Sequence, residues 1–262
     1  MSLKQLAASF LEKHPYGYRV GVFALDNFDF LLPHEVDYFA FPILARALGK
    51  VKSGTILDLG ANRGHSSRAF LKLLPGWRVE AFEANPLHEK RLRQILRNNP
   101  SLFHYHIAAV TDSDKGGLEL YTPMFQGMAM HSAAALSKEE ALSGVEGAFP
   151  ALTGRFSLTA TVTPTIAIDD LALNCDFIKI DIQGEELNAL KGMTQTIVRC
   201  QPVILVEMNL KQQGIGDFLE KLDYVAYTYD HASGRMLKGY GTHTVQFRNQ
   251  FFVARSIESV LR

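Results

Sequence analysis

Short apolar runs alternate with amphipathic segments along most of this chain. The apolar runs predict strands near residues 55–59, 78–83, 103–110, 176–181, 202–207, 223–229 and 246–254. Between them, apolar positions at helical spacing predict helices near residues 64–74, 86–98, 184–198 and 213–222. This alternation is typical of an α/β fold with a mostly parallel sheet and helices on both faces. No helical pattern separates the last two strands, so we expect them to form an antiparallel edge pair.

Two segments depart from this alternation. Residues 1–50 show helical patterns near residues 3–13 and 34–48, with an aromatic, partly extended stretch between them. We expect them to form an N-terminal helical cap on a main domain of residues 51–262. An insertion at about residues 112–160 follows the third strand, is rich in Met, Ala, Gly and Ser, and contains one predicted helix at 137–143. A segment of this length is either a substrate-facing lid or a plain surface insertion.

Composition narrows the class of protein. With 262 residues, 47% of them hydrophobic, the chain is long enough for one large domain with a full core. The formal net charge is zero and no long Lys or Arg run occurs, which argues against nucleic acid as a partner. Cys175 and Cys200 lack the spacing of a zinc or disulfide motif. No signal peptide or apolar run of about 20 residues is present, so we expect a cytoplasmic protein without membrane contact.

A glycine turn follows the first strand, in the sequence Asp58-Leu-Gly-Ala-Asn-Arg-Gly64. A dinucleotide site favours G-x-G-x-x-G, but Asn62 occupies the position of the middle glycine. Asp58 suits a ligand that carries an ammonium group, and the helix start near Ser66 suits a carboxylate. Glu83 ends the second strand, where an acid holds ribose hydroxyls. These features favour S-adenosylmethionine over a nicotinamide cofactor, and the expected cofactor-binding set is Asp58, Gly60, Asn62, Gly64, Ser66, Glu83 and Ala109.

The fourth and fifth strands both end in polar residues, which we expect to lie at the same end of the sheet. Asp181 follows the apolar run of the fourth strand, and period-two alternation places Lys179 on its side, so an ion pair between them is one interpretation. Glu207 and Asn209 end the fifth strand and are the predicted substrate contacts. The side-chain oxygens of Asp181, Glu207 and Asn209 could hold a hard cation, or they could orient and deprotonate a hydroxyl. We favour a metal-free site, because no dense carboxylate cluster accompanies them.

If the cofactor donates its methyl group to a hydroxyl, some group of the protein must take the hydroxyl proton. Asp181 is the first candidate for this catalytic base because of its location. His131 in the insertion and His231 after the sixth strand are the other two candidates.

Several segments together resemble the FkbM family of S-adenosylmethionine-dependent methyltransferases. They are ILDLGANRGHSS, VEAFEANP, VTPTIAIDDL, DFIKIDIQGEELNALKGM, ILVEMN and NQFFVAR, which span roughly residues 55–254. The resemblance implies a class I methyltransferase, with a Rossmann-like sheet of seven strands and an antiparallel last strand. It also implies O-methylation, often of sugar or natural-product hydroxyls. Family cofactor roles carry onto Asp58, Gly60, Asn62 and Glu83.

We therefore expect an S-adenosylmethionine-dependent O-methyltransferase that acts on a small-molecule or sugar hydroxyl, with a homodimer as a candidate assembly. An NAD(P)-dependent oxidoreductase on a similar fold is one alternative, although no hydride-transfer motif such as Tyr-x-x-x-Lys accompanies the turn. A non-catalytic module that keeps the fold and binds the cofactor is the other.

Overall fold

The computed structural model describes residues 35–130, 133–150, 153–182, 184–209, 214–240 and 247–261. These residues form two compact units. The larger unit contains the described residues up to 116 and from 164 onward, and the smaller contains those from 117 to 163. The glycine turn and the polar strand ends all belong to the larger unit.

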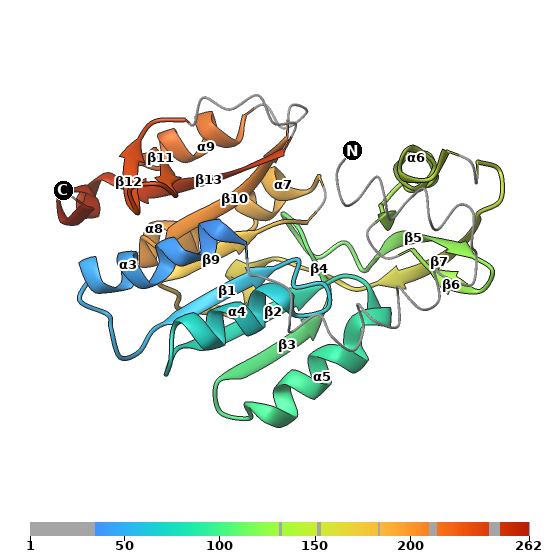
Figure 1. Cartoon of the computed structure of the whole chain (residues 1–262), viewed down its shortest axis with the longest axis horizontal. Helices are drawn as coiled ribbons and strands as arrows, with labels where there is room; N and C mark the ends of the chain where they lie inside the picture. The colour runs from blue at the N-terminus through green and yellow to red at the C-terminus, as the bar shows by residue number, and fades with distance from the viewer. Residues whose placement is uncertain are drawn as a thin grey trace. The chain divides into compact units, whose positions relative to one another are not determined.

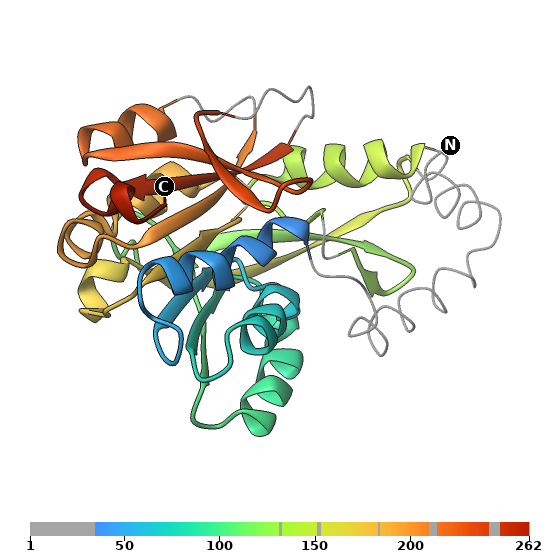
Figure 2. The ribbon, with the colours of Figure 1, turned by 60° about the vertical axis from the view of Figure 1, so that its left-hand side comes forward.

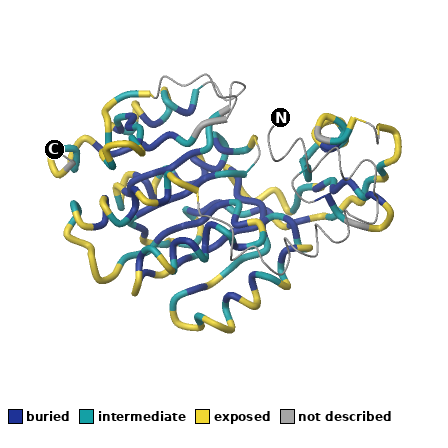
Figure 3. The backbone as a smooth tube through the Cα atoms, in the orientation of Figure 1, coloured by how far each residue is buried: buried dark blue, intermediate teal, exposed yellow. Residues whose placement is uncertain are grey.

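An eight-stranded sheet forms the centre of the larger unit, and its central strands are deeply buried (Figures 1 and 3). From edge to edge the order is β12 (Arg235–Lys238), β11 (Tyr224–Asp230), β13 (Phe247–Ala254), β10 (Val203–Asn209), β9 (Phe177–Ile180), β1 (Thr55–Leu59), β2 (Arg78–Glu83) and β3 (Phe103–Ile107). The strands from β10 to β3 pair in parallel, and β13 is antiparallel to both β10 and β11. The expected Rossmann-like sheet with an antiparallel last strand is confirmed.

One element of the sheet was not predicted. Strand β12 follows β11 through a short turn and pairs with it antiparallel, so the sheet has eight strands where the family resemblance implied seven. Strands β11 and β13 are antiparallel neighbours, as expected. The edge of the sheet, however, is β12 and neither strand of that pair.

Helices cover both faces of this sheet (Figure 2). Apolar residues of α3 (Ala40–Ala47), α4 (His65–Leu73) and α5 (Glu89–Asn98) share one buried cluster with one face of the strands. Residues of α7 (Glu186–Lys191), α8 (Thr194–Cys200) and α9 (Ile215–Lys221) share a second cluster with the other face. Four short 3₁₀ helices complete the described part of this unit: η2 (Val36–Phe39), η3 (Pro86–His88), η6 (Ile168–Leu171) and η7 (Arg255–Leu261).

Two predicted elements are divided in the structure. The helix expected at residues 184–198 is interrupted at Gly192, where a Cβ atom would lie only 2.0 Å from the carbonyl oxygen of Thr111. The strand expected at residues 103–110 ends at Ile107, and β4 (Ala109–Val110) then pairs in a separate ladder with β8 (Thr165–Ile166). In both cases a contact with a distant segment ends the local pattern.

The N-terminal part of the larger unit is helical where it is described. Phe41 of α3 makes an edge-on ring contact with Phe177 of β9 at 5.1 Å and with Phe251 of β13 at 5.7 Å. Helix α3 therefore packs directly on the sheet. The helix expected at residues 3–13 lies outside the described residues.

The smaller unit contains a three-stranded antiparallel sheet and one helix. Its strands are β5 (Leu118–Phe125), β6 (Met128–Ala129) and β7 (Ser157–Thr163), and its helix is α6 (Lys138–Ala148), which extends the predicted segment at 137–143. The side chain of Ser137 caps α6 by accepting the N–H of Glu140 at 3.1 Å. The insertion predicted after the third strand is therefore built around β5, which pairs antiparallel with β6 on one side and with β7 on the other.

Candidate active site

The glycine turn after β1 is held against the ends of two neighbouring strands. Gly60 has a φ of +78°, and a Cβ atom there would lie 1.7 Å from the carbonyl oxygen of Asp181, at the end of β9. On the other side, the N–H groups of Gly60 and Ala61 donate to the carbonyl oxygen of Phe82 in β2, at 2.9 and 3.0 Å. Only glycine combines this backbone conformation with this close approach.

Glu83 closes the far side of the same turn. Its Oε2 accepts the N–H of Asn62 at 2.7 Å, and its Oε1 accepts the N–H of Asn85 at 2.7 Å. The residue is only 8% exposed. Burial raises the pKa of Glu83 to about 7, although the two N–H donors act in the opposite direction. The structure thus places two of the predicted cofactor residues, Asn62 and Glu83, in direct contact.

Asp58 lies inside the protein rather than on the surface of the turn. The residue is 0% exposed, and its Oδ2 accepts the hydroxyl groups of Ser66 at 2.7 Å and Ser67 at 2.5 Å. Both serines belong to the first turn of α4. The carboxylate therefore fixes the start of α4 beneath the glycine turn. The expected contact of Asp58 with a ligand ammonium stays a prediction, because the structure shows its contacts with the chain itself.

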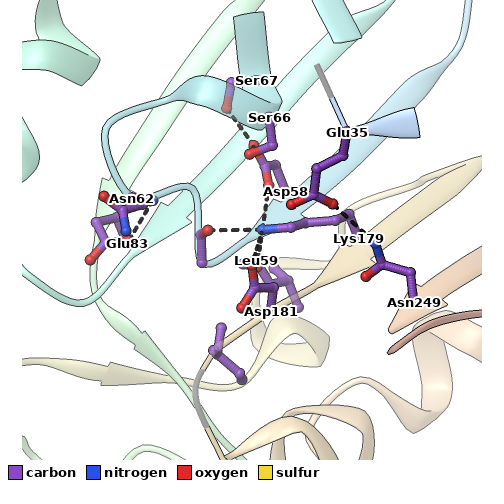
Figure 4. A network of polar contacts seen from close by, with 12 residues as sticks. Glu35, Asp58, Leu59, Asn62, Ser66, Ser67, Glu83, Lys179, Asp181 and Asn249 are labelled. Carbon is purple, nitrogen blue, oxygen red and sulfur yellow. Dashed lines mark hydrogen bonds and ion pairs between the residues drawn. The ribbon is translucent and has the colours of Figure 1, made fainter. Parts of the chain in front are cut away.

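Lys179 of β9 connects Asp58 to the rest of the site (Figure 4). Its Nζ lies 3.4 Å from Asp58 and 3.5 Å from Asp181, and it donates to the carbonyl oxygen of Gly60 at 2.9 Å. The residue is only 4% exposed. Burial disfavours its charge, but the two carboxylates outweigh this effect and raise the pKa of Lys179. The interpretation of Lys179 and Asp181 as an ion pair is confirmed.

Asp181 is the member of this network that ligands can reach. Its side chain is 31% exposed, against 0% for Asp58. Glu207 lies at the carboxyl end of the neighbouring strand β10, close enough for the charge of Asp181 to act on it. Burial, followed by this neighbouring charge, raises the pKa of Glu207 to about 8. The structure therefore brings together the predicted catalytic base and one of the two predicted substrate contacts.

A polar residue of β13 lies beside Glu207 and was not among the predicted site residues. Asn249 pairs in register with Glu207, and its side-chain amide donates to Glu35 at 3.0 Å and to Asp37 at 2.9 Å. His231, one of the candidate bases, lies 3.5 Å from Asp37 with its side chain 49% exposed. Only the pairing of β10 with β13 makes Asn249 a neighbour of Glu207, so no local sequence pattern could have indicated it.

The remaining predicted site residues lie elsewhere or are only partly described. Asn209 is the last residue of β10, Gly64 precedes the first residue of α4, and Ala109 lies in the short ladder of β4 with β8. Their contacts with a ligand stay predictions. His131 falls outside the described residues.

Two acids of the sequence motifs have structural partners. Glu186 accepts the N–H of Ile182 at 3.2 Å and the N–H of Gly184 at 3.0 Å, so its carboxyl group holds the turn that precedes α7. Asp169 caps the start of α8 by accepting the N–H of Thr196 at 2.8 Å and that of Gln195 at 2.9 Å.

Across the residues that the structure describes, no three His, Cys, Asp or Glu side chains converge as a metal site would require. Within the same residues, none of the helices combines the length and the apolar character needed to span a bilayer.

Comparison with known proteins identifies the family. The profile of the methyltransferase FkbM domain matches residues 58–231, which include the glycine turn, Glu83, Asp181 and Glu207. No match is found among curated protein sequences. Among solved structures, an FkbM methyltransferase from Methylobacillus flagellatus KT is 17% identical with a TM-score of 0.48, covering 77% of this chain and 44% of its own. A precorrin-6y C5,15-methyltransferase from Geobacter metallireducens GS-15 is 15% identical with a TM-score of 0.39, covering 80% of this chain and 86% of its own.

This chain thus spans less than half the length of the FkbM structure that it matches. The domain profile, by contrast, covers most of this chain and includes both the glycine turn and the polar ends of β9 and β10. The chain belongs to the FkbM methyltransferase family.

Proposed function

We propose that this protein is an S-adenosylmethionine-dependent methyltransferase that methylates a hydroxyl group of a small molecule or sugar. The observation that supports the cofactor most directly is the position of Glu83, a carboxyl group beside the glycine turn at the end of β2. An acid at this place in a Rossmann-like sheet binds the hydroxyl groups of a cofactor ribose. The family match supports the same cofactor class.

The residues at the turn suit the nucleoside end of S-adenosylmethionine. Each oxygen of Glu83 accepts one backbone N–H, and a carboxylate has lone pairs left to accept ribose hydroxyls. When bound, the cofactor supplies a methyl group that is activated by a sulfonium. Asp58 supports the site from inside, because it fixes the start of α4 through Ser66 and Ser67.

Asp181 is the group that we assign to the acceptor hydroxyl. It lies at the carboxyl end of β9, where open α/β sheets bind their ligands, and its side chain is accessible. With S-adenosylmethionine bound, its carboxylate would accept the proton of the acceptor hydroxyl as the methyl group is transferred to the oxygen. We assign Glu207 and Asn209, at the end of the adjacent strand β10, to the orientation of the acceptor. Proton transfer of this kind contributes about 10²–10⁴-fold to a rate.

Calorimetric titration with S-adenosylhomocysteine tests the cofactor assignment. We expect micromolar binding to the wild-type protein and loss of binding in Glu83→Ala. Glu80→Ala is the matched control, because Glu80 lies on the same strand but forms its ion pair with His106 at 2.6 Å. Binding of a nicotinamide dinucleotide in place of S-adenosylhomocysteine would overturn the proposal.

The acceptor class is tested by transfer of a labelled methyl group. Glycosides and polyketide alcohols are the first compounds to screen, because both present neutral hydroxyl groups. The proposal predicts a methyl ether as the product, and a methylated nitrogen or carbon would contradict it.

A further inference from the structure

Strand β7 is an edge of the three-stranded sheet in the smaller unit, because that sheet has the order β6, β5, β7. Its seven residues, Ser-Leu-Thr-Ala-Thr-Val-Thr, include no charged residue, no proline and no glycine, and its register with β5 runs without a bulge. Most of the strand is exposed to solvent, and Val162 is 69% exposed. Charges, prolines and bulges commonly protect an edge strand from pairing with another chain, and β7 has none of them.

The contacts of β5 show which backbone groups of β7 face outward. Tyr121 of β5 exchanges both of its backbone hydrogen bonds with Ala135, at 2.8 and 3.0 Å, so its N–H and C=O point away from β7. Tyr121 lies opposite Ala160, which makes this a non-hydrogen-bonded pair of the ladder. The N–H and C=O of Ala160 therefore point to the free edge, and alternation along the strand directs those of Leu158 and Val162 the same way. Within the described part of the chain, no further strand pairs with β7 on that side.

The sequence of β7 is nearly symmetric about Ala160. If two copies pair antiparallel around this residue, Ala160 faces its own copy and Leu158 faces Val162 of the second copy. On the other face of the strands, Thr159 lies opposite Thr161. Aliphatic side chains then meet on one face and hydroxyl groups on the other, and both are favourable combinations across a pair of strands.

The charged residues beside β7 are held within their own copy. Glu119 of β5, which lies opposite Val162, accepts the hydroxyl of Tyr121. The guanidinium of Arg155, two residues before β7, lies 5.6 Å from the centre of the Phe125 ring. Because β7 itself is uncharged, pairing with a second copy places no charge against its own equivalent.

We propose that two copies of this chain associate through β7, as an antiparallel pair of strands centred on Ala160. The pair satisfies the outward N–H and C=O groups of Leu158, Ala160 and Val162 in both copies. The two-fold symmetry closes the contact, so assembly stops at a dimer. Seven residues are few beside the roughly 20–30 per side of a standard interface, so we expect dissociation in the micromolar range. The dimer does not depend on the proposed methyl transfer.

Sedimentation equilibrium of the full chain, from low to several hundred micromolar concentration, measures the assembly. The average mass of the wild type should rise from 29.2 kDa toward twice that value. Ala160→Pro removes an outward N–H and no bond of the ladder with β5, so this variant should stay monomeric. A wild type that stays monomeric throughout, or an Ala160→Pro variant that dimerises like the wild type, would overturn the proposal.

Two further variants control for the substitution itself. Ala160→Thr keeps the outward N–H and should still dimerise. Leu237→Lys introduces a charge at an exposed apolar residue of β12, the edge strand of the other sheet, and should also leave the dimer intact. Loss of the dimer in Leu237→Lys would place the contact at β12 and contradict the role of β7.

Disulfide trapping tests the register without the proline variant. Facing residues of a hydrogen-bonded antiparallel pair have Cα atoms about 5.5 Å apart, a distance that a disulfide can span. Ala160→Cys should therefore give a covalent dimer under mild oxidation. Val162→Cys is the matched control, because its two copies would lie four residues, or about 13 Å, apart along the strands.

The native Cys175 and Cys200 occur in both trapping variants and in the wild type, so the wild type measures their contribution. Trapping at residue 162 that equals or exceeds trapping at residue 160 would overturn the proposed pairing. Assemblies that grow beyond a dimer in the wild type would contradict the closed two-fold contact.

Discussion

The Lys179 ammonium lies 3.4 Å from the Asp58 carboxylate, and both groups are buried within the sheet. Asp58 holds the start of α4, and Lys179 donates to Gly60 in the turn between β1 and that helix. The second carboxylate beside Lys179 is Asp181, at 3.5 Å. One buried cation thus joins the proposed cofactor turn to the proposed acceptor end of the site.

Removal of this cation should destabilise the protein strongly. Lys179→Met keeps most of the side-chain length but leaves the buried Asp58 carboxylate without its counter-charge. Loss of one partner of a buried ion pair costs about 3–5 kcal/mol. Urea unfolding of wild type and variant measures this loss. The double variant Lys179→Met/Asp58→Asn should recover part of it, and a Lys179→Met loss below about 1 kcal/mol would contradict the role of the pair.

Glu83 should make the free energy of unfolding depend on pH. Its pKa of about 7 in the folded protein exceeds its ordinary value of 4.5, so the folded chain keeps a proton that the unfolded chain has released. This contribution is fully present below pH 4.5 and is lost as the pH rises through 7. The shift corresponds to about 3 kcal/mol.

Glu83→Gln removes this titration, so the difference between variant and wild type isolates it from other carboxyl groups. The variant should lose less stability than the wild type between pH 4.5 and pH 7, as measured by urea unfolding at several pH values. Parallel pH profiles for the two proteins would show that Glu83 does not titrate in this range.

Gly60→Ala should be far more damaging than the same change at Gly49. Both glycines have positive φ values, +78° and +69°, but only at Gly60 does an added Cβ meet backbone, at 1.7 Å from the Asp181 carbonyl oxygen. The conformation alone costs about 1–2 kcal/mol at either position. We expect Gly60→Ala to cost about 2 kcal/mol more than Gly49→Ala in urea unfolding. Equal losses would mean that the turn does not touch the end of β9 as described.

The stability of the protein should depend more on the charge than on the size of the side chain at position 249. Its amide donates to Glu35 and Asp37, so Asn249→Asp replaces a donor with a third carboxylate. Asn249→Ala should cost about 1 kcal/mol, the value of a typical hydrogen bond. Asn249→Asp should cost more at pH 7 and approach the alanine variant at low pH, where carboxylates are protonated. The thermal midpoints of both variants at two pH values test this, and a more stable aspartate variant at pH 7 would contradict the contacts.

The elements that the sequence predicted best are those whose limits are set locally. Strands β1 and β2 occupy the expected residues, because a short apolar run in each case ends at a turn or an acid. The predicted strand 103–110 and helix 184–198 were wrong in being continuous. The strand divides where β4 pairs with β8, and the helix divides at Gly192, which packs against Thr111. Such contacts between distant segments leave no mark on the local pattern.

The same distinction applies to the candidate site. The glycine turn and the acids at the strand ends were predicted. Each follows an apolar run in the sequence, and the carboxyl ends of parallel strands lie at the same side of the sheet. That Asp58 faces inward was not predicted, since its orientation depends on the hydroxyl groups of Ser66 and Ser67 in the following helix. Asn249 depends on the pairing of β13 with β10, which only the fold determines.

The unpredicted strand β12 has a consequence for how this protein behaves at high concentration. An exposed sheet edge can template the addition of a strand from another molecule, and charged side chains on the outermost strand oppose this. Strand β12 carries Arg235 and Lys238, and Lys238 is also tied to Glu258 at 2.6 Å. A continuous intermolecular sheet through this edge is therefore disfavoured, so if the protein forms a homodimer, we expect its two copies to meet through another surface.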